Sequence, residues 1–213
     1  MHYVMSDIHG EYDRYQAMLD KIQPSLEDNV YILGDIIDRK PDGIKIAQDI
    51  MGRPNFHFIK GNHEVMCIND MLYHDAESKA IWHMNGCSPT RRVLKYKLSP
   101  FERMEILKFF RDAPDCMDVQ IGEQKFHLVH GWPGTTTEER VWTRPEQCWP
   151  APIKGVTTIV GHTCVYFLGQ NSGKPFQIGH YPGFIAIDCG CGNNTNLRSL
   201  ACIRLEDMQE YYT

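Results

Sequence analysis

Three short apolar runs alternate with two segments of helical periodicity in the first part of the chain. The apolar runs span residues 3–5, 30–33 and 56–59, and the helical segments span residues 11–23 and 42–52. Connections of this length between strands favour parallel pairing with right-handed crossovers. The pattern therefore predicts an α/β fold whose first three strands lie in one parallel sheet.

Side chains that can bind metal ions follow each of these runs directly. The three segments are Ser-Asp-Ile-His-Gly at 6–10, Gly-Asp-Ile-Ile-Asp-Arg at 34–39 and Gly-Asn-His-Glu at 61–64, and two later apolar runs end at His130 and at His162. Each segment alone is also explained by ordinary turn or helix-cap chemistry. Turn and cap chemistry does not explain why such a segment recurs at five strand ends. In sheets of this kind, functional sites lie beyond the carboxyl ends of the strands. We therefore expect the five segments to form one site.

The rest of the chain is helical first and then rich in strands. Residues 64–112 have helical patterning, with a helix start at Ser99-Pro100, and we expect a helical insertion there rather than a separate domain. Apolar runs predict further strands at 117–121, 125–129, 157–160, 184–187 and 200–205. The first two of these are expected to form a hairpin. Residues 131–156 show no clear period and are expected to form a long loop near the site. We expect residues 1–213 to form a single domain.

Composition argues against several classes of protein. The 213 residues carry 22 Lys and Arg against 27 Asp and Glu, a net charge of −5, which disfavours general binding to nucleic acids or anionic membranes. No apolar run approaches the ~18 residues that cross a bilayer, and the first residues lack the pattern of a signal peptide. The eight cysteines include no Cys-x-x-Cys pair. We therefore expect reduced thiols and a cytoplasmic protein.

The ligand-type side chains form a set of carboxylates, imidazoles and one amide, without thiolates. Its members are Asp7, His9, Asp35, Asn62, His130 and His162. Such a set suits divalent first-row metals better than a structural zinc site. Six ligands exceed the needs of one open catalytic metal. They suit two metals ~3.5–4 Å apart that share a carboxylate and promote in-line phosphoryl displacement by a bridging hydroxide.

In the order Asp-x-His-Gly, Gly-Asp-x-x-Asp-Arg and Gly-Asn-His-Glu, followed by two separated histidines, the chain resembles the PPP-type (calcineurin-like) metallophosphoesterases. Serine/threonine protein phosphatases and symmetrical diadenosine tetraphosphate hydrolases belong to this family. The resemblance covers residues 3–64 densely, then 124–164 and the closing strands. The short separation of His130 and His162 resembles the bacterial and phage-type protein phosphatase branch. The resemblance implies a mixed β-sandwich core flanked by helices, with a helical insertion at about 64–112.

The resemblance also implies a role for each residue of the site. It implies two divalent metal ions, with Mn²⁺ ahead of Fe or Zn²⁺. The implied metal ligands are Asp7 and His9 for the first metal, Asp35 for both, and Asn62, His130 and His162 for the second. The implied catalytic pair is His63, which protonates the leaving-group oxygen, and Asp38, which orients His63. The implied phosphate-binding residues are Arg39, Arg144 and Asn62.

One position departs from the family pattern. The family usually has glycine after the Asp-Arg pair, and this chain has Lys40. If the backbone requires a positive φ there, lysine costs about 1 kcal/mol. Alternatively, a relaxed loop lets Lys40 add positive charge beside the substrate phosphate.

The favoured function is hydrolysis of phosphate monoesters, as a serine/threonine protein phosphatase acting on a phosphorylated protein or a small phosphoester. A symmetrical diadenosine tetraphosphate hydrolase is the enzymatic alternative, because the same metals can act on a phosphoanhydride. A binding scaffold without catalysis is the third possibility. That scaffold is expected to have lost ligands or the acid, whereas here all are present.

Overall fold

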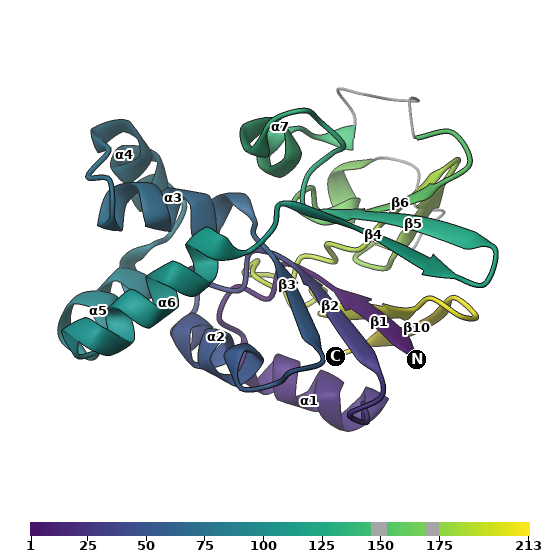
Figure 1. Cartoon of the computed structure of the whole chain (residues 1–213), viewed down its shortest axis with the longest axis horizontal. Helices are drawn as coiled ribbons and strands as arrows, with labels where there is room; N and C mark the ends of the chain where they lie inside the picture. Colours follow the sequence, from purple (N-terminus) through teal and green to yellow (C-terminus); the bar gives the residue numbers. More distant parts are fainter. Residues whose placement is uncertain (146–152, 169–174) are drawn as a thin grey trace.

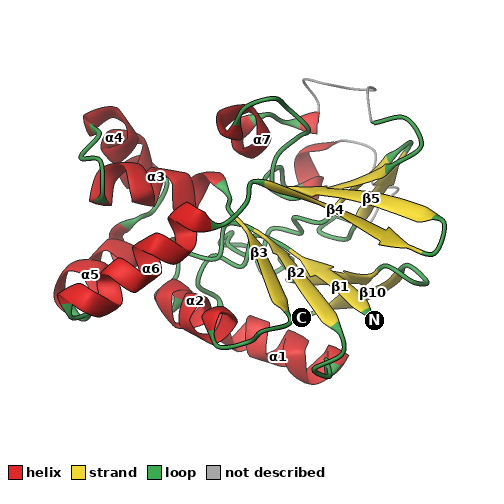
Figure 2. Cartoon of the chain, in the orientation of Figure 1, coloured by secondary structure: helices red, strands yellow, loops and turns green. Residues whose placement is uncertain are grey.

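The computed structural model describes residues 1–145, 153–168 and 175–213 of the chain. Two five-stranded sheets lie face to face, with helices on the outside and at one end of the pair (Figure 1, Figure 2). This mixed β-sandwich flanked by helices confirms the predicted α/β fold class.

The first sheet has the strand order β10-β9-β1-β2-β3. Its strands are β1 (His2–Met5), β2 (Asn29–Leu33), β3 (Phe56–Ile59), β9 (Ala201–Arg204) and β10 (Gln209–Tyr212). As predicted, β1, β2 and β3 are parallel, and β9 joins the other side of β1 in the antiparallel sense. The outer face of the sheet is covered by the crossover helices α1 (Tyr12–Ile22) and α2 (Gly43–Met51) (Figure 1).

The second sheet has the strand order β4-β5-β6-β8-β7. Its strands are β4 (Cys116–Ile121), β5 (Gln124–Val129), β6 (Thr157–Val160), β7 (Gly179–Tyr181) and β8 (Phe184–Ala186). The predicted hairpin is confirmed by the antiparallel pairing of β4 with β5, and β5, β6 and β8 are parallel. Strands β7 and β10 were not predicted, because three or four partly polar residues carry too little period to be recognised.

Successive residues of the first sheet point into two different apolar clusters. Tyr3 and Met5 of β1 pack with the residues of α1 and α2, whereas Val4 packs against the second sheet. All three side chains are buried. A strand buried on both faces has a continuous apolar run instead of an alternating pattern, which explains the three runs seen in the sequence.

The predicted helical insertion consists of four consecutive helices at one end of the sandwich (Figure 1). They are α3 (Asn62–Met71), α4 (Ala76–Met84), α5 (Ser88–Tyr96) and α6 (Pro100–Asp112). Ser99 caps α6 as predicted, because its hydroxyl accepts from the Glu102 amide while the Glu102 carboxylate accepts from the Ser99 amide. None of the helices in the described ranges has the length and apolar character that a bilayer span requires.

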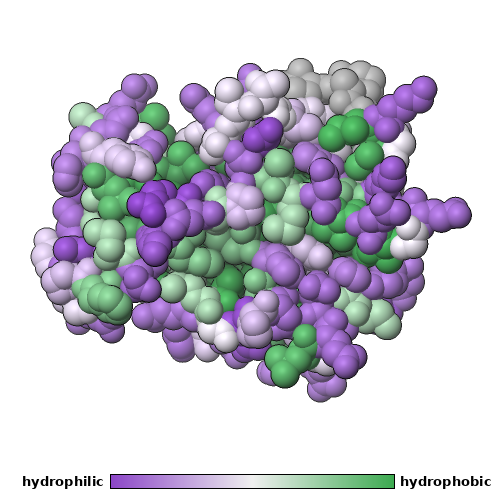
Figure 3. All heavy atoms as spheres, in the orientation of Figure 1, coloured by the Kyte–Doolittle hydropathy of each residue, from purple (hydrophilic) through white to green (hydrophobic). Residues whose placement is uncertain are grey.

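The face of the molecule drawn in Figure 3 carries both polar and apolar side chains. Figure 3 shows hydrophilic side chains around the periphery and hydrophobic ones mainly toward the middle. A cavity of about 470 Å³ lies between β3 and α6, lined in part by Phe56, Phe58 and Phe109. None of the predicted site residues lines this cavity.

The prediction that residues 131–156 form a loop throughout is wrong. They include the helix α7 (Thr137–Trp142), which Thr136 and Glu139 close with a capping box. The helix has six residues and buries only Val141, so it leaves almost no periodic signal in the sequence. Residues 146–152 of the expected loop lie outside the described residues.

Candidate metal site

The five predicted segments meet at one edge of the sandwich, where β1, β2, β3, β5 and β6 end. Backbone hydrogen bonds join them, from His9 N to Asp35 O (2.9 Å) and from Gly161 N to His130 O (2.8 Å). The predicted ligands with at most 2% of their surface exposed are Asp7, His9, Asp35, Asn62 and His130, and His162 is half-buried. Polar side chains are rarely buried this far unless they are paired or bind a metal.

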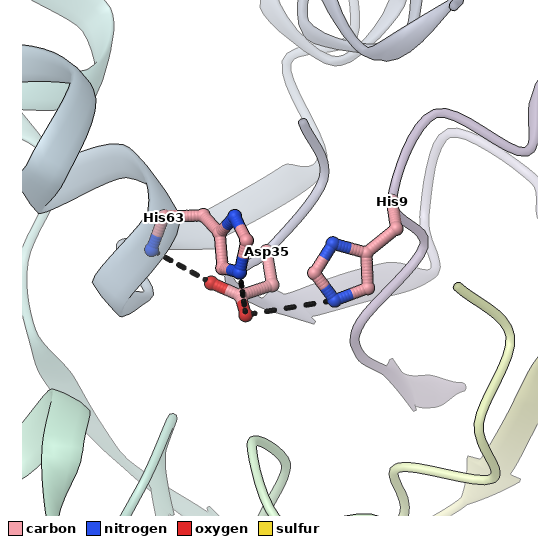
Figure 4. Close-up of side chains that lie close together, drawn as sticks. All are labelled: His9, Asp35 and His63. Carbon is pink, nitrogen blue, oxygen red and sulfur yellow. Dashed lines mark hydrogen bonds and ion pairs between the residues drawn. The ribbon is translucent and has the colours of Figure 1, made fainter. Parts of the chain in front are cut away.

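A first group of donor atoms surrounds one oxygen of Asp35 (Figure 4). His9 Nε2 lies 3.7 Å and His63 Nε2 3.8 Å from Asp35 Oδ2. Asp7 Oδ1 lies 3.9 Å from the same nitrogen of His9. Figure 4 shows both imidazoles turned toward the Asp35 carboxylate, and the two rings meet edge-on with their centroids 4.7 Å apart.

A second group of donor atoms surrounds the other oxygen of Asp35. His130 Nε2 lies 3.4 Å from Asp35 Oδ1 and 3.0 Å from Asn62 Oδ1. Asp35, His130 and His162 offer one ligand atom each, all within 4.8 Å of one another, and so do His9, Asp35 and His63. Asp35 is thus shared by two adjacent groups of ligands, which is the arrangement that a bridging carboxylate requires.

Backbone carbonyls fix the orientation of two of the imidazoles. His9 Nδ1 donates to Ile37 O at 3.0 Å, and His130 Nδ1 donates to Leu33 O at 2.6 Å. A carbonyl can only accept, so the proton must lie on Nδ1. Each ring therefore presents Nε2 to the centre of the site, as metal-ligating histidines do.

The electrostatics of the site favour a divalent cation. Burial, together with the nearby carboxylates of Asp188 and Asp35, raises the pKa of Asp7 well above its usual range. Burial also acts to raise the pKa of Asp35, but His130 and His63 outweigh it and hold that pKa well below its usual range. Several buried carboxylates in one place repel each other unless a cation lies between them. In addition, His162 Nε2 is buried and has no hydrogen-bond partner among the described residues, so the donor set fits a metal.

His63 and Asp38 form a buried pair beside the first group. His63 Nδ1 donates to Asp38 Oδ2 at 2.6 Å, and both side chains have at most 1% of their surface exposed. Burial acts to lower the pKa of His63, but the charges of Asp35 and Asp38 and the hydrogen bond to Asp38 raise it overall. The imidazole is therefore suited to carry a proton near neutral pH.

The two arginines predicted to bind phosphate follow different elements of the fold, β2 and α7. Arg39 follows β2 and, with Gly86 and Gly192, lines a cavity of about 460 Å³. A Cβ added to Gly192 would lie 2.4 Å from the His9 ring, so this cavity adjoins the first group of ligands. Arg144 follows α7, and its Nη1 donates to Thr163 Oγ1 at 3.3 Å, next to His162.

Of the two alternatives for Lys40, the structure excludes backbone strain. The non-glycine residues with positive φ around the site are Asp7, His9, Asp35, Asp38, Arg39 and His162, and Lys40 is not among them. Lys40 Nζ instead donates to Asn194 Oδ1 at 3.0 Å and lies 3.8 Å from a Glu11 oxygen. The strain lies one and two residues earlier, at Arg39 (φ 63°) and Asp38 (φ 71°). Such strain concentrates at functional sites.

Three buried residues of the site were not singled out from the sequence. Glu64 accepts from the amides of Asp35 and Gly61, and burial followed by the Asp35 charge raises its pKa to about 7. Asp188 follows β8, and burial raises its pKa. The third, Trp82, donates from Nε1 to Asp38 Oδ2 at 2.6 Å. Asp188 repeats the pattern of an apolar run followed by an acid with a glycine close behind it, here Gly190, so this signal was present. Nothing near Trp82 in the sequence points to Asp38.

Comparison with known proteins agrees with this geometry. Residues 3–180 match the family described as calcineurin-like phosphoesterase. Over 66 residues, 30% of this chain, it is 41% identical to a symmetrical bis(5'-nucleosyl)-tetraphosphatase of Wigglesworthia glossinidia brevipalpis. Over 139 residues, 62% of this chain, it is 27% identical to serine/threonine-protein phosphatase 2 of Escherichia coli. The matched segments cover 24% and 59% of those two proteins.

Solved structures with the same fold cover the whole chain. A protein serine/threonine phosphatase from Saccharomyces cerevisiae superposes with a TM-score of 0.64 at 12% identity, over 100% of this chain and 78% of its own. A putative diadenosine tetraphosphatase superposes with a TM-score of 0.62 at 13% identity, over 100% of this chain and 92% of its own. At such identities the likeness concerns the fold alone. The family match over residues 3–180 shows that the chain belongs to the calcineurin-like phosphoesterases.

Proposed function

We propose that this protein is a dinuclear-metal phosphatase that hydrolyses phosphate monoesters, with phosphoserine or phosphothreonine in proteins as its substrate class. The observation that carries the proposal is the Asp35 carboxylate, whose two oxygens each face a separate group of buried ligands. The His63–Asp38 pair beside it supports a proton donor for a leaving alkoxide.

The proposed metal ligands are Asp35 and the five predicted ligands that surround it. We assign Asp7, His9 and Asp35 to the first metal, and Asp35, Asn62, His130 and His162 to the second. Two divalent ions in such a site supply Lewis-acid stabilisation of phosphate oxygens and activate the attacking water. The mixture of oxygen and imidazole ligands suits Mn²⁺, with Fe and Zn²⁺ as the other candidates.

The chain's own side chains would bind the phosphoryl group and protonate the oxygen that leaves it. Arg39, Arg144 and the Asn62 amide hold its oxygens, since guanidinium and amide groups are donors that match phosphate oxygens. His63 Nε2 donates a proton to the departing oxygen as the P–O bond breaks, and Asp38 keeps the imidazole in the orientation that allows it. The cavity lined by Arg39 and Gly192 lies next to His9.

A symmetrical dinucleotide tetraphosphatase is the second candidate activity. The support for it is the 41% identity to such an enzyme over 66 residues, set against 27% identity to a protein phosphatase over 139 residues. Both activities use the same ligand groups. Hydrolysis of a phosphoanhydride, however, depends less on His63, because its leaving phosphate needs no proton. A cytoplasmic location is proposed with either activity.

Metal dependence and the two substrates test the proposal together. Metal-stripped protein is assayed with p-nitrophenyl phosphate before and after Mn²⁺ is added, and then with a phosphothreonine peptide and diadenosine tetraphosphate. Asp35→Asn should lose at least about 10²-fold in kcat, because it weakens both metal positions. Asp49→Asn, a carboxylate between α1 and α2 that bonds Tyr15 and Arg53, is the matched control. Folded protein that is inactive with every divalent metal would contradict the proposal, and preference for the dinucleotide would select the second activity.

A further inference from the structure

The part of the helical insertion between Trp82 and Thr90 contacts the loop that carries Asp38. Trp82 lies in α4 with no exposed surface, and its indole Nε1 donates to Asp38 Oδ2 at 2.6 Å. An indole N–H can only donate, so the direction of this bond is certain. The contact joins residues 44 positions apart in the chain.

One oxygen of Asp38 receives both of the carboxylate's side-chain donors. Oδ2 accepts from Trp82 Nε1 and from His63 Nδ1, each at 2.6 Å. Oδ1 is buried and has no partner among the described residues. Among the described residues, the indole is therefore the one side chain besides His63 that donates a hydrogen bond to this carboxylate.

The insertion also holds the backbone of the same loop. Asp38 N donates to Thr90 Oγ1 at 2.9 Å, and Arg39 N donates to Gly86 O at 3.0 Å. Both residues have positive φ, 71° and 63°, a backbone conformation that is unfavourable for non-glycine residues. Strained conformations of this kind persist only where the surroundings hold them. Here the hydrogen bonds from α4, α5 and the turn between them provide that restraint.

We propose that Trp82 is a positioning residue for proton transfer by His63, and that the 82–90 segment belongs to the catalytic apparatus. The inference rests on the proposed function, in which His63 Nε2 gives its proton to the leaving oxygen as the P–O bond breaks. Solvent water then returns a proton to His63. Without the indole, the Asp38 carboxylate can rotate, and the His63 ring loses the fixed direction that its Nδ1–H bond supplies.

Leaving groups of different basicity test this role. Departure of the leaving oxygen depends strongly on protonation in phenyl phosphate. It depends less on protonation in p-nitrophenyl phosphate, and hardly at all in 2,4-dinitrophenyl phosphate. Trp82→Phe removes the donor and keeps most of the ring. It should lower kcat about tenfold for phenyl phosphate and about twofold or less for 2,4-dinitrophenyl phosphate. A variant that only disturbs the metals or Arg39 should lose the same factor with all three substrates.

Further variants keep the test decisive. Tyr15→Phe also removes a buried donor from a carboxylate, that of Asp49. Neither residue belongs to the site, so its kcat should match the wild type with every substrate. Thr90→Val should behave like Trp82→Phe, and Thr90→Ser, which keeps the acceptor for Asp38 N, should restore the rate. Metal content and melting temperature are measured for each variant.

His63→Asn separates this inference from the proposed function. Suppose that the loss of kcat in His63→Asn depends steeply on the leaving group, whereas Trp82→Phe loses the same factor with all three substrates or loses nothing. The role proposed for Trp82 is then contradicted. If His63→Asn itself loses the same factor with every substrate, His63 is not the acid, and the proposed mechanism fails first.

Discussion

At the scale of single residues, His130 connects proton binding with metal binding. Burial acts to lower its pKa, but the Asp35 charge and hydrogen bond raise it to about 10. For His162, burial and the His130 charge lower the pKa to about 3. In the metal-free protein at pH 7, His130 therefore carries a proton that a metal must displace, and His162 carries none.

Metal binding should accordingly release at least about one proton at pH 7. Because the pKa of His130 is raised, the apparent metal affinity should increase as pH rises toward 10, where the competing proton is lost. Calorimetric titration of metal-free protein with Mn²⁺, in two buffers of different ionisation enthalpy, measures the number of protons. Binding heats that do not depend on the buffer would contradict this account.

Lys40 gives a second prediction at this scale. Because Lys40 does not have a positive φ, Lys40→Gly relieves no strain, adds freedom to the unfolded chain and loses the contact to Asn194. It should lower the free energy of unfolding by about 0.5–1 kcal/mol. Gly10→Ala, at φ 72° with the new Cβ 2.4 Å from Lys40 O, should cost clearly more. Denaturant unfolding of both variants measures this, and a stabilised Lys40→Gly would show that the strain is at Lys40 after all.

At the scale of elements, the parts that could be predicted are those with a repeated pattern. The three runs of the first sheet, each followed by a polar segment that contains a glycine, predicted both the parallel strands and the residues now found around Asp35. Contacts between distant elements could not be predicted in the same way. The bond from Trp82 to Asp38 depends on how α4 packs, and no local spacing encodes that packing.

Helix α7 is the clearest element that the sequence did not predict, and its capping box should determine its stability. Thr136 Oγ1 accepts from Glu139 N, and the Glu139 carboxylate accepts from the amides of Thr135 and Thr136. The helix ends at Trp142, whose ring meets the His162 ring edge-on at 6.0 Å, and Arg144 follows. Thr136→Ala should therefore lower the free energy of unfolding by about 1 kcal/mol.

The same variant should also affect binding of the substrate phosphate. If α7 positions Arg144, the loss of its cap should raise KM for a small phosphoester more than it lowers kcat. Thr136→Ser keeps the hydroxyl acceptor and should leave both constants unchanged. Equal stability of Thr136→Ala and the wild type would show that the cap contributes nothing to this segment.

At the scale of the whole molecule, two apolar clusters share one sheet. Met18 lies in the cluster between the first sheet and its helices, and Leu128 lies in the cluster between the two sheets. Both side chains have no exposed surface. Alternate residues of β1 belong to one cluster or the other, so β1 cannot leave its sheet without opening both. The site residues from β5 and β6 also bond to residues of the first sheet, as His130 does to Leu33 O.

This shared sheet is the physical reason to expect that residues 1–213 unfold as one domain. Met18→Ala and Leu128→Ala should each lower the free energy of unfolding by about 2–5 kcal/mol. Both should shift the same single calorimetric transition, with equal calorimetric and van't Hoff enthalpies. Mn²⁺ at about 100 times its Kd should raise the free energy of unfolding by about 2.7 kcal/mol in the wild type and in both variants. Two transitions, with Leu128→Ala lowering only one of them, would show that the sheets unfold independently.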